Sequence, residues 1–509
     1  MKKLTAYLIC ALLPMLLLAQ QNSDTAAITD PEFAQHYASR PQPTIRGKII
    51  HASAEEMANI RIKYSLVHIG QPIQSSYEIR PDANGSFQIV LNERLPNRQI
   101  WFTLGDYARL CLMANEELTL TFDLEKLKKN FVYWIGDGVD FGGKDADKNR
   151  LINQYIVFQR EQTPDIPTQI EALDINRPTY LSGLDSLFKL QNEQMERFFA
   201  RYGNQHRELI TGESTLAYYA KKIAYFLRHD QPLIDTPAIL APVYAISNDT
   251  YSYLRVLSLY LKKVGFSATK QTSNLETLAR YYDETLPAAY ADLLKLYMGH
   301  PDLKHLTQHY EAISPSLHFD WSRDYLSEQL TSLRKKIAQI DSISHSATVE
   351  KPLSSSLGSL SIKTQTGISL YRSPQQTGES LLKDLRSAYA NKLVLIDIWA
   401  TWCVPCIQAM PYAKKLQEEA KASNLPVEFV YLCTSGGSDE EQWKNKVLEI
   451  QQPGTHLFVD SKAISELMTM FNMGGFPSYL LLKPDGSYDE KTVNSLSNLQ
   501  LDTLKDLLQ

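Results

Sequence analysis

Cysteine is scarce in this chain: five residues among 509 are too few for a disulfide scaffold. Basic charge is not in excess either, since 52 Lys and Arg face 57 Asp and Glu, which argues against nucleic-acid binding through bulk positive charge. Beyond its first twenty residues the chain has no apolar run of membrane-spanning length. With 21% charged and 44% hydrophobic residues the composition is globular, and the length fits about two to four domains.

The N-terminus has the pattern of a secretory signal peptide. Lys2 and Lys3 precede an almost wholly apolar stretch, Leu4–Leu18, and the small residue Ala19 follows it. This stretch is shorter than the about 20 residues of a spanning helix, which favours cleavage over an uncleaved anchor. We therefore predict a signal peptide over residues 1–20. Its removal takes away two lysines and no acid, so the exported chain is more acidic than the net charge of −5 indicates.

Residues 44–135 have the composition of β structure. Short runs rich in branched and aromatic residues, such as Thr44–Ile50 and Gln99–Leu104, are separated by turn signals. Asn84-Gly85 is a good hairpin signal between two such runs. We predict a small antiparallel β sandwich or open barrel here. The exit at residues 134–145 is rich in Gly and Asp but lacks the acid spacing of an EF-hand, so we expect no calcium loop.

From residue 146 to residue 340 the apolar residues repeat at intervals typical of amphipathic helices. We predict an all-α region whose aromatic side chains form its core. Its isolated histidines do not have the spacing of metal ligands. The repeat is clearest in two series: Leu184, Leu187, Phe188, Met195 and Phe198, then Leu216, Tyr219, Ile223 and Phe226.

Residues 341–360 are rich in serine, which is typical of a linker and predicts a domain boundary. Over residues 361–509 strand patterns alternate with helical patterns, which is typical of an α/β domain with a central mixed sheet. The predicted architecture is therefore multidomain. An N-terminal antiparallel β sandwich or barrel is followed by a central all-α region and a C-terminal α/β domain.

The clearest chemical signal is Cys403-Val404-Pro405-Cys406, which follows an apolar strand pattern and opens a helical pattern. Cysteines at i and i+3 lie on neighbouring corners of the first helical turn, close enough for a disulfide. Free amides and the positive end of the helix dipole stabilise a thiolate at a helix N-terminus, so Cys403 is the expected nucleophile. Cys406, one turn deeper, is the expected resolving thiol.

A C-x-x-C pair can also be half of a zinc site, which requires a second pair of Cys or His ligands. Cys433 and Cys111 stand alone in the sequence, and no histidine lies beside either. We therefore expect no metal ion and no cofactor other than a redox-active disulfide between Cys403 and Cys406. We interpret Cys433 as a buried structural thiol rather than a third redox cysteine, and Cys111 as a core residue of the β region.

The stretch Leu393–Pro411, LVLIDIWATWCVPCIQAMP, resembles the active-site segment of the thioredoxin superfamily, and more closely that of the periplasmic TlpA/ResA-type thiol–disulfide oxidoreductases. The resemblance covers roughly residues 360–509 and implies a thioredoxin fold. It implies that Cys403 and Cys406 are the redox pair and that Asp397 is the buried acid. A carboxyl group within an apolar strand loses hydration, so its pKa should rise and it can carry the proton of Cys406; a purely structural Asp397 is the alternative.

The resemblance also implies a substrate-binding surface. Pro477 matches a cis-proline loop beside which a substrate peptide pairs as an additional strand. The substrate-binding residues so implied are Trp402, Val404, Pro405, Phe476 and Pro477. The chain departs from ordinary thioredoxins at Val427–Cys433, a strand pattern without a lysine to pair with the acid. This departure leaves the role of Asp397 less fixed than that of the cysteines.

Two functions are open from the sequence. The favoured one is a periplasmic oxidoreductase of a Gram-negative bacterium that reduces protein disulfides, with an upstream membrane or periplasmic thiol donor. The alternative is a polypeptide- or glycan-binding protein whose C-terminal domain is accessory. No nucleic-acid partner is expected, and the sequence does not indicate an oligomeric state.

Overall fold

The computed structural model describes residues 26–231, 239–265, 275–298, 302–346, 357–374 and 377–508. The predicted signal peptide, residues 1–20, lies outside these ranges, as do residues 347–356 of the predicted linker. The chain divides into two compact units. The N-terminal unit is Met1–Gly299 with Gln308–Leu330, and the C-terminal unit is His300–Thr307 with Thr331–Gln509. No helix within the described ranges is long and apolar enough to cross a membrane.

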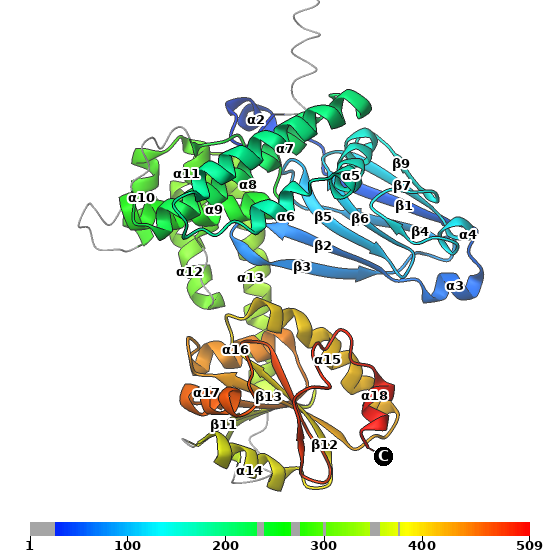
Figure 1. Cartoon of the computed structure of the whole chain (residues 1–509), viewed down its shortest axis with the longest axis vertical. Helices are drawn as coiled ribbons and strands as arrows, with labels where there is room; N and C mark the ends of the chain where they lie inside the picture. The colour runs from blue at the N-terminus through cyan, green and yellow to red at the C-terminus, as the bar shows by residue number, and fades with distance from the viewer. Residues whose placement is uncertain are drawn as a thin grey trace, which may run out of the picture. The chain divides into compact units, whose positions relative to one another are not determined.

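The β part of the N-terminal unit consists of two sheets (Figure 1), with strand orders β4-β1-β7-β9 and β3-β2-β5-β6-β8. Along β5 buried and half-buried residues alternate, as expected for a strand with one face in a core. Residues from both sheets, among them Ile45 and Phe102, belong to one hydrophobic cluster. The strands are β1 Thr44–Ile50, β2 Ile62–His68, β3 Gln71–Ile79, β4 Ser86–Val90, β5 Arg98–Leu104, β6 Ala108–Ala114, β7 Glu117–Asp123, β8 Val132–Tyr133 and β9 Val139–Gly142.

The prediction of an antiparallel arrangement was wrong for two strand pairs. β1 runs parallel to β7, from Thr44 beside Glu117 to Ile50 beside Asp123, and β6 runs parallel to β8. The other pairs of the two sheets are antiparallel. Strand patterns along the chain do not reveal direction here, because a half-buried strand shows the same alternation whichever way its neighbour runs.

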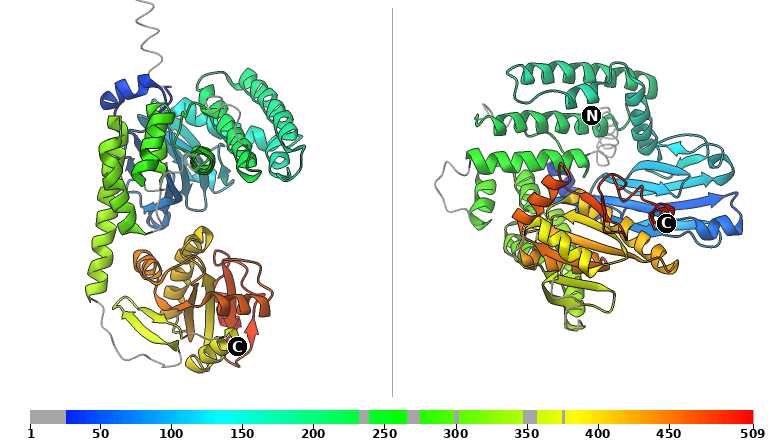
Figure 2. Two further views of the ribbon diagram at one scale, coloured as in Figure 1. Left: turned by 90° about the vertical axis from the view of Figure 1, so that its left-hand side faces the viewer. Right: turned by 60° about the horizontal axis from the view of Figure 1, so that its bottom comes forward.

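The helical part of the N-terminal unit follows the predicted periodicity. Helices α7 and α8 lie side by side (Figure 2), and the buried residues of α7 include Leu184, Met195 and Phe198. Helices α12 and α13 contain residues of both units. The helices are α2 Pro31–His36, α3 Ala54–Asn59, α4 Leu124–Leu127, α5 Ala146–Glu161, α6 Ile166–Glu171, α7 Tyr180–Tyr202, α8 Arg207–Arg228, α9 Asn248–Tyr260, α10 Leu275–Thr285, α11 Ala288–Tyr297, α12 Leu303–Ile313 and α13 Asp320–Ser346, with short turns at Tyr37–Ser39, Leu261–Gly265 and Ser314–Ser316.

Side chains of helix α5 form hydrogen bonds with backbone groups along part of one edge of the five-stranded sheet. The amide of Asn149 accepts from the backbone N–H of Met113 in β6 and donates to its C=O, both at 2.8 Å. One turn later, Asn153 makes the same pair of bonds to Cys111, at 3.0 and 2.7 Å. Both asparagines are fully buried. Their amides therefore stand where a neighbouring strand would otherwise satisfy the backbone of β6.

Removing these two amides should loosen the sheet edge. In the double variant Asn149→Leu/Asn153→Leu, four buried backbone groups lose their partners, at about 1–3 kcal/mol each. We expect hydrogen exchange in β6, measured by mass spectrometry, to accelerate by about tenfold or more. The matched control Asn192→Leu changes an exposed asparagine of α7 and should leave that exchange unchanged. Wild-type exchange in the double variant would show that the asparagines do not protect the edge.

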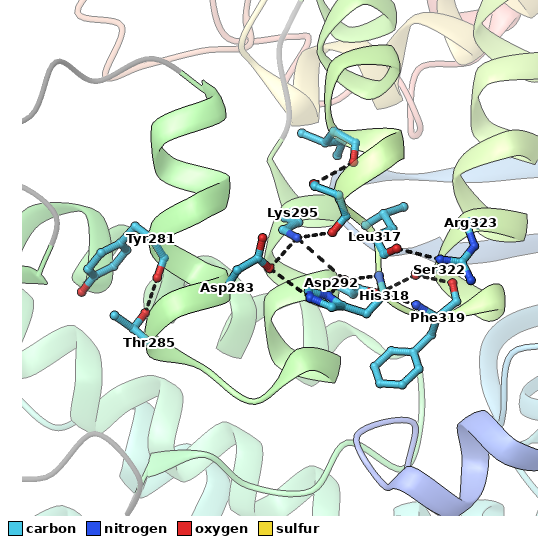
Figure 3. Close-up of polar contacts among 12 residues, drawn as sticks. Tyr281, Asp283, Thr285, Asp292, Lys295, Leu317, His318, Phe319, Ser322 and Arg323 are labelled. Carbon is cyan, nitrogen blue, oxygen red and sulfur yellow. Dashed lines mark hydrogen bonds and ion pairs between the residues drawn. The ribbon is translucent and has the colours of Figure 1, made fainter.

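A second polar cluster fixes the start of α13 to α11 (Figure 3). Asp292, fully buried in α11, accepts hydrogen bonds from the backbone N–H of His318 at 2.9 Å and from the hydroxyl of Ser322 at 2.6 Å. Lys295, also fully buried, forms an ion pair with Asp283 at 2.6 Å. A carboxylate from one helix thus satisfies backbone N–H groups at the beginning of another, which is the task of an N-cap.

The C-terminal unit is built on one seven-stranded sheet in the order β10-β11-β14-β13-β12-β15-β16. Strands β11, β14, β13 and β12 are parallel, and β10, β15 and β16 are antiparallel to their neighbours, which confirms the predicted mixed sheet. Helices cover both faces (Figure 1). The elements are β10 Ser359–Lys363, β11 Ile368–Arg372, α14 Gly378–Ala388, β12 Leu393–Trp399, α15 Val404–Ala422, β13 Val427–Thr434, α16 Glu440–Ile450, β14 Gly454–Val459, α17 Ser461–Met470, β15 Ser478–Leu482, β16 Tyr488–Asp489 and α18 Leu501–Asp506.

The predicted linker is structured at both of its ends. Helix α13 continues to Ser346, and strand β10 begins at Ser359 as the edge of the seven-stranded sheet. The serine-rich composition concealed β10 because its stability comes from pairing with β11, which local composition does not report.

Strand β12 decides which side chains face the C-x-x-C helix. All seven of its residues are buried, and successive side chains point to opposite faces of the sheet. One face packs in the core with α15 and α16, and the other packs in the core with α14 and α17. Asp397 alternates with Leu395 and Trp399, which belong to the first core, so its carboxyl faces α15. The two sets are Leu393, Leu395 and Trp399 on one face, and Val394, Ile396 and Ile398 on the other.

Candidate active site

The C-x-x-C segment forms the start of α15, a short turn after β12. Cys403 is the N-cap of α15, and Val404 and Pro405 occupy its first positions. Proline fits there because the first N–H groups of a helix have no intrahelical acceptor. A disulfide joins Cys403 to Cys406, whose Cα atoms are 5.3 Å apart, a usual separation for a disulfide. The structure thus brings together the two cysteines that the sequence singled out.

The two sulfur atoms have different surroundings. The backbone N–H of Cys406 donates to Cys403 Sγ at 3.2 Å. Cys403 is 4% exposed, whereas Cys406 is fully buried. An amide donor and the positive end of the helix dipole favour negative charge on Cys403 Sγ once the disulfide is reduced. The arrangement therefore suits Cys403 to attack a disulfide. It suits Cys406 to remain a buried, protonated thiol until it attacks the resulting mixed disulfide.

The loop after β13 braces the turn that carries the cysteines, and sequence reasoning missed it. The hydroxyl of Ser438 accepts from the hydroxyl of Thr401 at 2.9 Å and from its N–H at 3.2 Å. The indole N–H of Trp402 donates to the carbonyl of Gly436 at 2.9 Å. Gly437 has φ +73°, and a Cβ there would lie 2.8 Å from the indole nitrogen. The Gly436-Gly437 pair shortly after the strand pattern was the available signal for this close approach.

An aromatic pair, of which Trp402 is exposed and Phe476 is half-buried, lies beside the disulfide. Trp402 is 53% exposed, and its ring packs edge-on against Phe476 with centroids 5.8 Å apart. The Phe476–Pro477 peptide bond is cis, as the resemblance implied. Because β15 pairs with β12 from Ser478 beside Ile398, this loop lies at the end of β12 from which the cysteine turn departs. The predicted substrate-binding residues are therefore gathered at one end of the sheet.

Asp397 is enclosed in the core on the face that α15 covers. It is 1% exposed, and within the described ranges neither of its carboxyl oxygens has a hydrogen-bond partner. Burial raises the pKa of Asp397 to about 8, because a carboxylate loses its hydration there. A carboxyl with such a pKa exchanges its proton readily at neutral pH, which is the property required of a proton carrier for a buried thiol.

The two remaining described cysteines are buried free thiols in different units. Burial raises the pKa of Cys111 to about 12 and raises the pKa of Cys433 further above its usual range. Neither thiol carries appreciable thiolate near neutral pH. Among the residues that the structure describes, no group of three or more His, Cys, Asp or Glu side chains could hold a metal ion.

A family model described as thioredoxin-like matches residues 391–488, which include the cysteine pair, Asp397 and Pro477. The chain is 32% identical over 79 residues to a thioredoxin of Coprinus comatus, covering 70% of that protein and 16% of this chain. The chain therefore belongs to the thioredoxin family, through its C-terminal unit.

Two bacterial relatives match longer stretches of the chain. The thioredoxin-like protein YneN of Bacillus subtilis is 30% identical over 119 residues, which are 23% of this chain and 65% of YneN. The thiol–disulfide oxidoreductase ResA of Bacillus cereus is 28% identical over 123 residues, which are 24% of this chain and 64% of ResA. The chain thus spans just under two thirds of the length of these two relatives. The predicted resemblance to the ResA branch is confirmed.

Proposed function

We propose that the protein is a thiol–disulfide oxidoreductase that reduces disulfides in partner proteins. The observation that carries this proposal is the cysteine pair at the start of α15, with the N–H of Cys406 directed at Cys403 Sγ. The names of relatives such as ResA support the same class of activity. The pair itself is the redox group, and the proposal requires no other cofactor.

The reaction proceeds in two exchange steps. The thiolate of Cys403 attacks one sulfur of the partner's disulfide, a bond forms between these two sulfurs, and the partner's other sulfur leaves as a thiolate. Cys406 then gives its proton to the carboxylate of Asp397 and attacks Cys403 Sγ. The bond to the partner breaks and the partner's second sulfur leaves, to be protonated from solvent. The partner gains two electrons, and Cys403 and Cys406 become a disulfide.

Substrate docks at the end of the sheet where the cysteine turn and the cis-proline loop meet. Trp402 offers an exposed aromatic ring that packs against the half-buried ring of Phe476. Val404 and Pro405 form the adjoining start of α15, and the backbone next to Pro477 pairs with an extended peptide of the partner. Pairing of a partner's backbone beside this loop requires an extended protein segment, which a small-molecule disulfide does not offer.

The setting of the reaction is also part of the proposal. The signal-peptide pattern of residues 1–20 supports export, and the resemblance to periplasmic TlpA/ResA-type oxidoreductases supports the periplasm of a Gram-negative bacterium. Disulfides persist in that compartment, so a reductase there requires an upstream membrane or periplasmic thiol donor to regenerate its dithiol.

A trapping variant tests this function. In Cys406→Ser the first exchange proceeds and the second does not, so partner proteins should accumulate as mixed disulfides with Cys403, released by reductant and identified by mass spectrometry. Cys403→Ser/Cys406→Ser is the control and should capture none. If the control captures the same partners as the trap, with no reductant-sensitive bond, the polypeptide- or glycan-binding alternative holds and the reductase does not.

A further inference from the structure

Four polar side chains form a continuous row across the face of the sheet that α15 covers. In the strand register, Asp397 of β12 stands beside Tyr479 of β15 on one side and Tyr431 of β13 on the other, and Tyr431 stands beside His456 of β14. Lateral neighbours in a sheet point to the same face, and their strands are about 4.8 Å apart. All four residues are buried. The buried acid therefore has a tyrosine on each side.

Tyr431 is fixed in this row by three separate features. Its hydroxyl accepts a hydrogen bond from the side-chain N–H of Gln452 at 2.6 Å. Its ring stacks on the imidazole of His456, with centroids 4.5 Å apart and an interplanar angle of 13°. Gly454 leaves the room that the ring requires, since a Cβ there would lie 2.9 Å from Tyr431 Cε2. The surroundings are thus shaped for a large aromatic ring at this position.

The groups that face Asp397 carry no positive charge. Tyr431 and Tyr479 are neutral, and burial lowers the pKa of His456 to about 4, so its ring is also neutral near pH 7. The imidazole Nε2 of His456 lies 2.9 Å from the backbone carbonyl of Gln452, to which it donates as the neutral ring.

The buried residues that helices contribute to this core add no charge to the surroundings of Asp397; those of α13 and α18 are Ile340 and Leu504. Among the described buried residues of α15, Cys406 is the only titratable one. The buried residues of α16 are apolar or aromatic. The neighbour of Asp397 on β13 is thus an aromatic ring, in a strand without the lysine that pairs with the acid in ordinary thioredoxins.

We propose that Tyr431 is a positioning residue for the dithiol reaction: its ring, held by Gln452 and His456, fills the place beside Asp397 and keeps cations and bulk water away from the carboxyl that exchanges a proton with Cys406. This inference rests on the proposed function. A carboxyl without a cation or water beside it stays protonated to higher pH than an ordinary one, in line with the raised pKa of Asp397. Tyr431 therefore sets the pH at which Asp397 can accept the proton of Cys406.

The reaction of the reduced protein with the aromatic disulfide DTNB separates the relevant steps. Cys403 releases the first thiolate of the reagent, and closure by Cys406 releases the second, so the second phase reports the proton transfer. Its rate rises with pH as Asp397 ionises. In Tyr431→Lys, an ammonium beside the carboxyl should lower the midpoint of that rise by about 1–3 pH units. In Tyr431→Ala, water that enters beside the carboxyl should lower it by a smaller amount, and Tyr431→Phe should keep the wild-type midpoint.

The matched control is Tyr389→Phe, which removes a hydroxyl of a half-buried tyrosine that bonds Thr455 on the other face of the sheet and should not move the midpoint. Wild-type midpoints in both Tyr431→Lys and Tyr431→Ala would overturn the inference. If Tyr431→Lys does not fold, a wild-type midpoint in Tyr431→Ala alone would overturn it. These outcomes differ from failure of the proposed function, in which the wild-type protein itself releases no second thiolate.

Discussion

In a Cys403→Ser variant, the first thiolate release from DTNB is expected to slow by about a thousandfold or more, because the ionised nucleophile is gone and the other cysteines that the structure describes are buried. Cys406→Ser should keep the first release near its wild-type rate and abolish the second. The asymmetry follows from the surroundings of the two sulfurs: only Cys403 Sγ receives the backbone N–H at the start of α15. Stopped-flow absorbance on the reduced proteins measures both phases.

Cys433→Ala is the matched control for this series. Its thiol is fully buried, and burial raises its pKa, so its removal should leave both phases at wild-type rates. A Cys406→Ser variant that lost the first phase, together with a Cys403→Ser variant that retained it, would reverse the assignment of nucleophile and resolving thiol. Loss of reaction in Cys433→Ala would show that a third cysteine takes part.

The second large effect concerns Asp397, whose replacement by Asn should stabilise the oxidised protein at neutral and alkaline pH. The ordinary pKa of this carboxyl is 3.8, and burial raises it to about 8 in the folded protein. Between these pH values Asp397 is ionised in the unfolded chain but still protonated in the folded protein. The contribution of Asp397 to the free energy of unfolding is therefore most favourable below about pH 4 and is lost as the pH rises towards 8. Wild-type stability should therefore fall across this window by at most about 1.4 kcal/mol per pH unit.

Asp397→Asn cannot ionise, so this part of the pH dependence should disappear. The difference in unfolding free energy between the two proteins should grow by a few kcal/mol from about pH 4 to about pH 8 and then level off. Urea unfolding of the C-terminal unit, followed at several pH values, measures it. The same variant should slow the second DTNB phase by about 10²–10⁴-fold, because the proton acceptor of Cys406 is lost.

Asp506→Asn is the matched control, since Asp506 is an exposed carboxylate of α18. It should change neither the pH dependence of stability nor the second phase. An Asp397→Asn protein with the wild-type pH dependence of stability would mean that Asp397 is ionised in the folded state. An unchanged second phase would mean that Cys406 gives its proton to another group.

The sequence predicted the C-terminal unit well because its signals are local. A strand buried on both faces is a continuous apolar run, so β12 and the one acid within it are visible without a structure. The cysteines follow directly, and their spacing fixes their relation on the helix. The proline loop is distant in sequence, and it was found only because the family resemblance supplied its motif.

The features that escaped prediction depend on contacts between distant parts of the chain. Ser438 gives no sign in the sequence that it bonds Thr401, because the two meet only when β12 and β13 pair. The same pairing places Tyr431 beside Asp397, whereas the strand pattern alone shows only that no lysine is present. The parallel direction of β1 and β7 is likewise set by assembly of the sheet rather than by either strand.

The asparagine pairs of α5 limit how the N-terminal unit can be shortened. A truncation that ends before residue 146 would leave the backbone groups of Cys111 and Met113 without the amides of Asn149 and Asn153. An exposed strand edge of this kind invites pairing with other chains, so such fragments should self-associate when expressed. Soluble fragments of the N-terminal unit must therefore retain α5, and proteolysis that removes α5 should expose a strand edge that promotes aggregation.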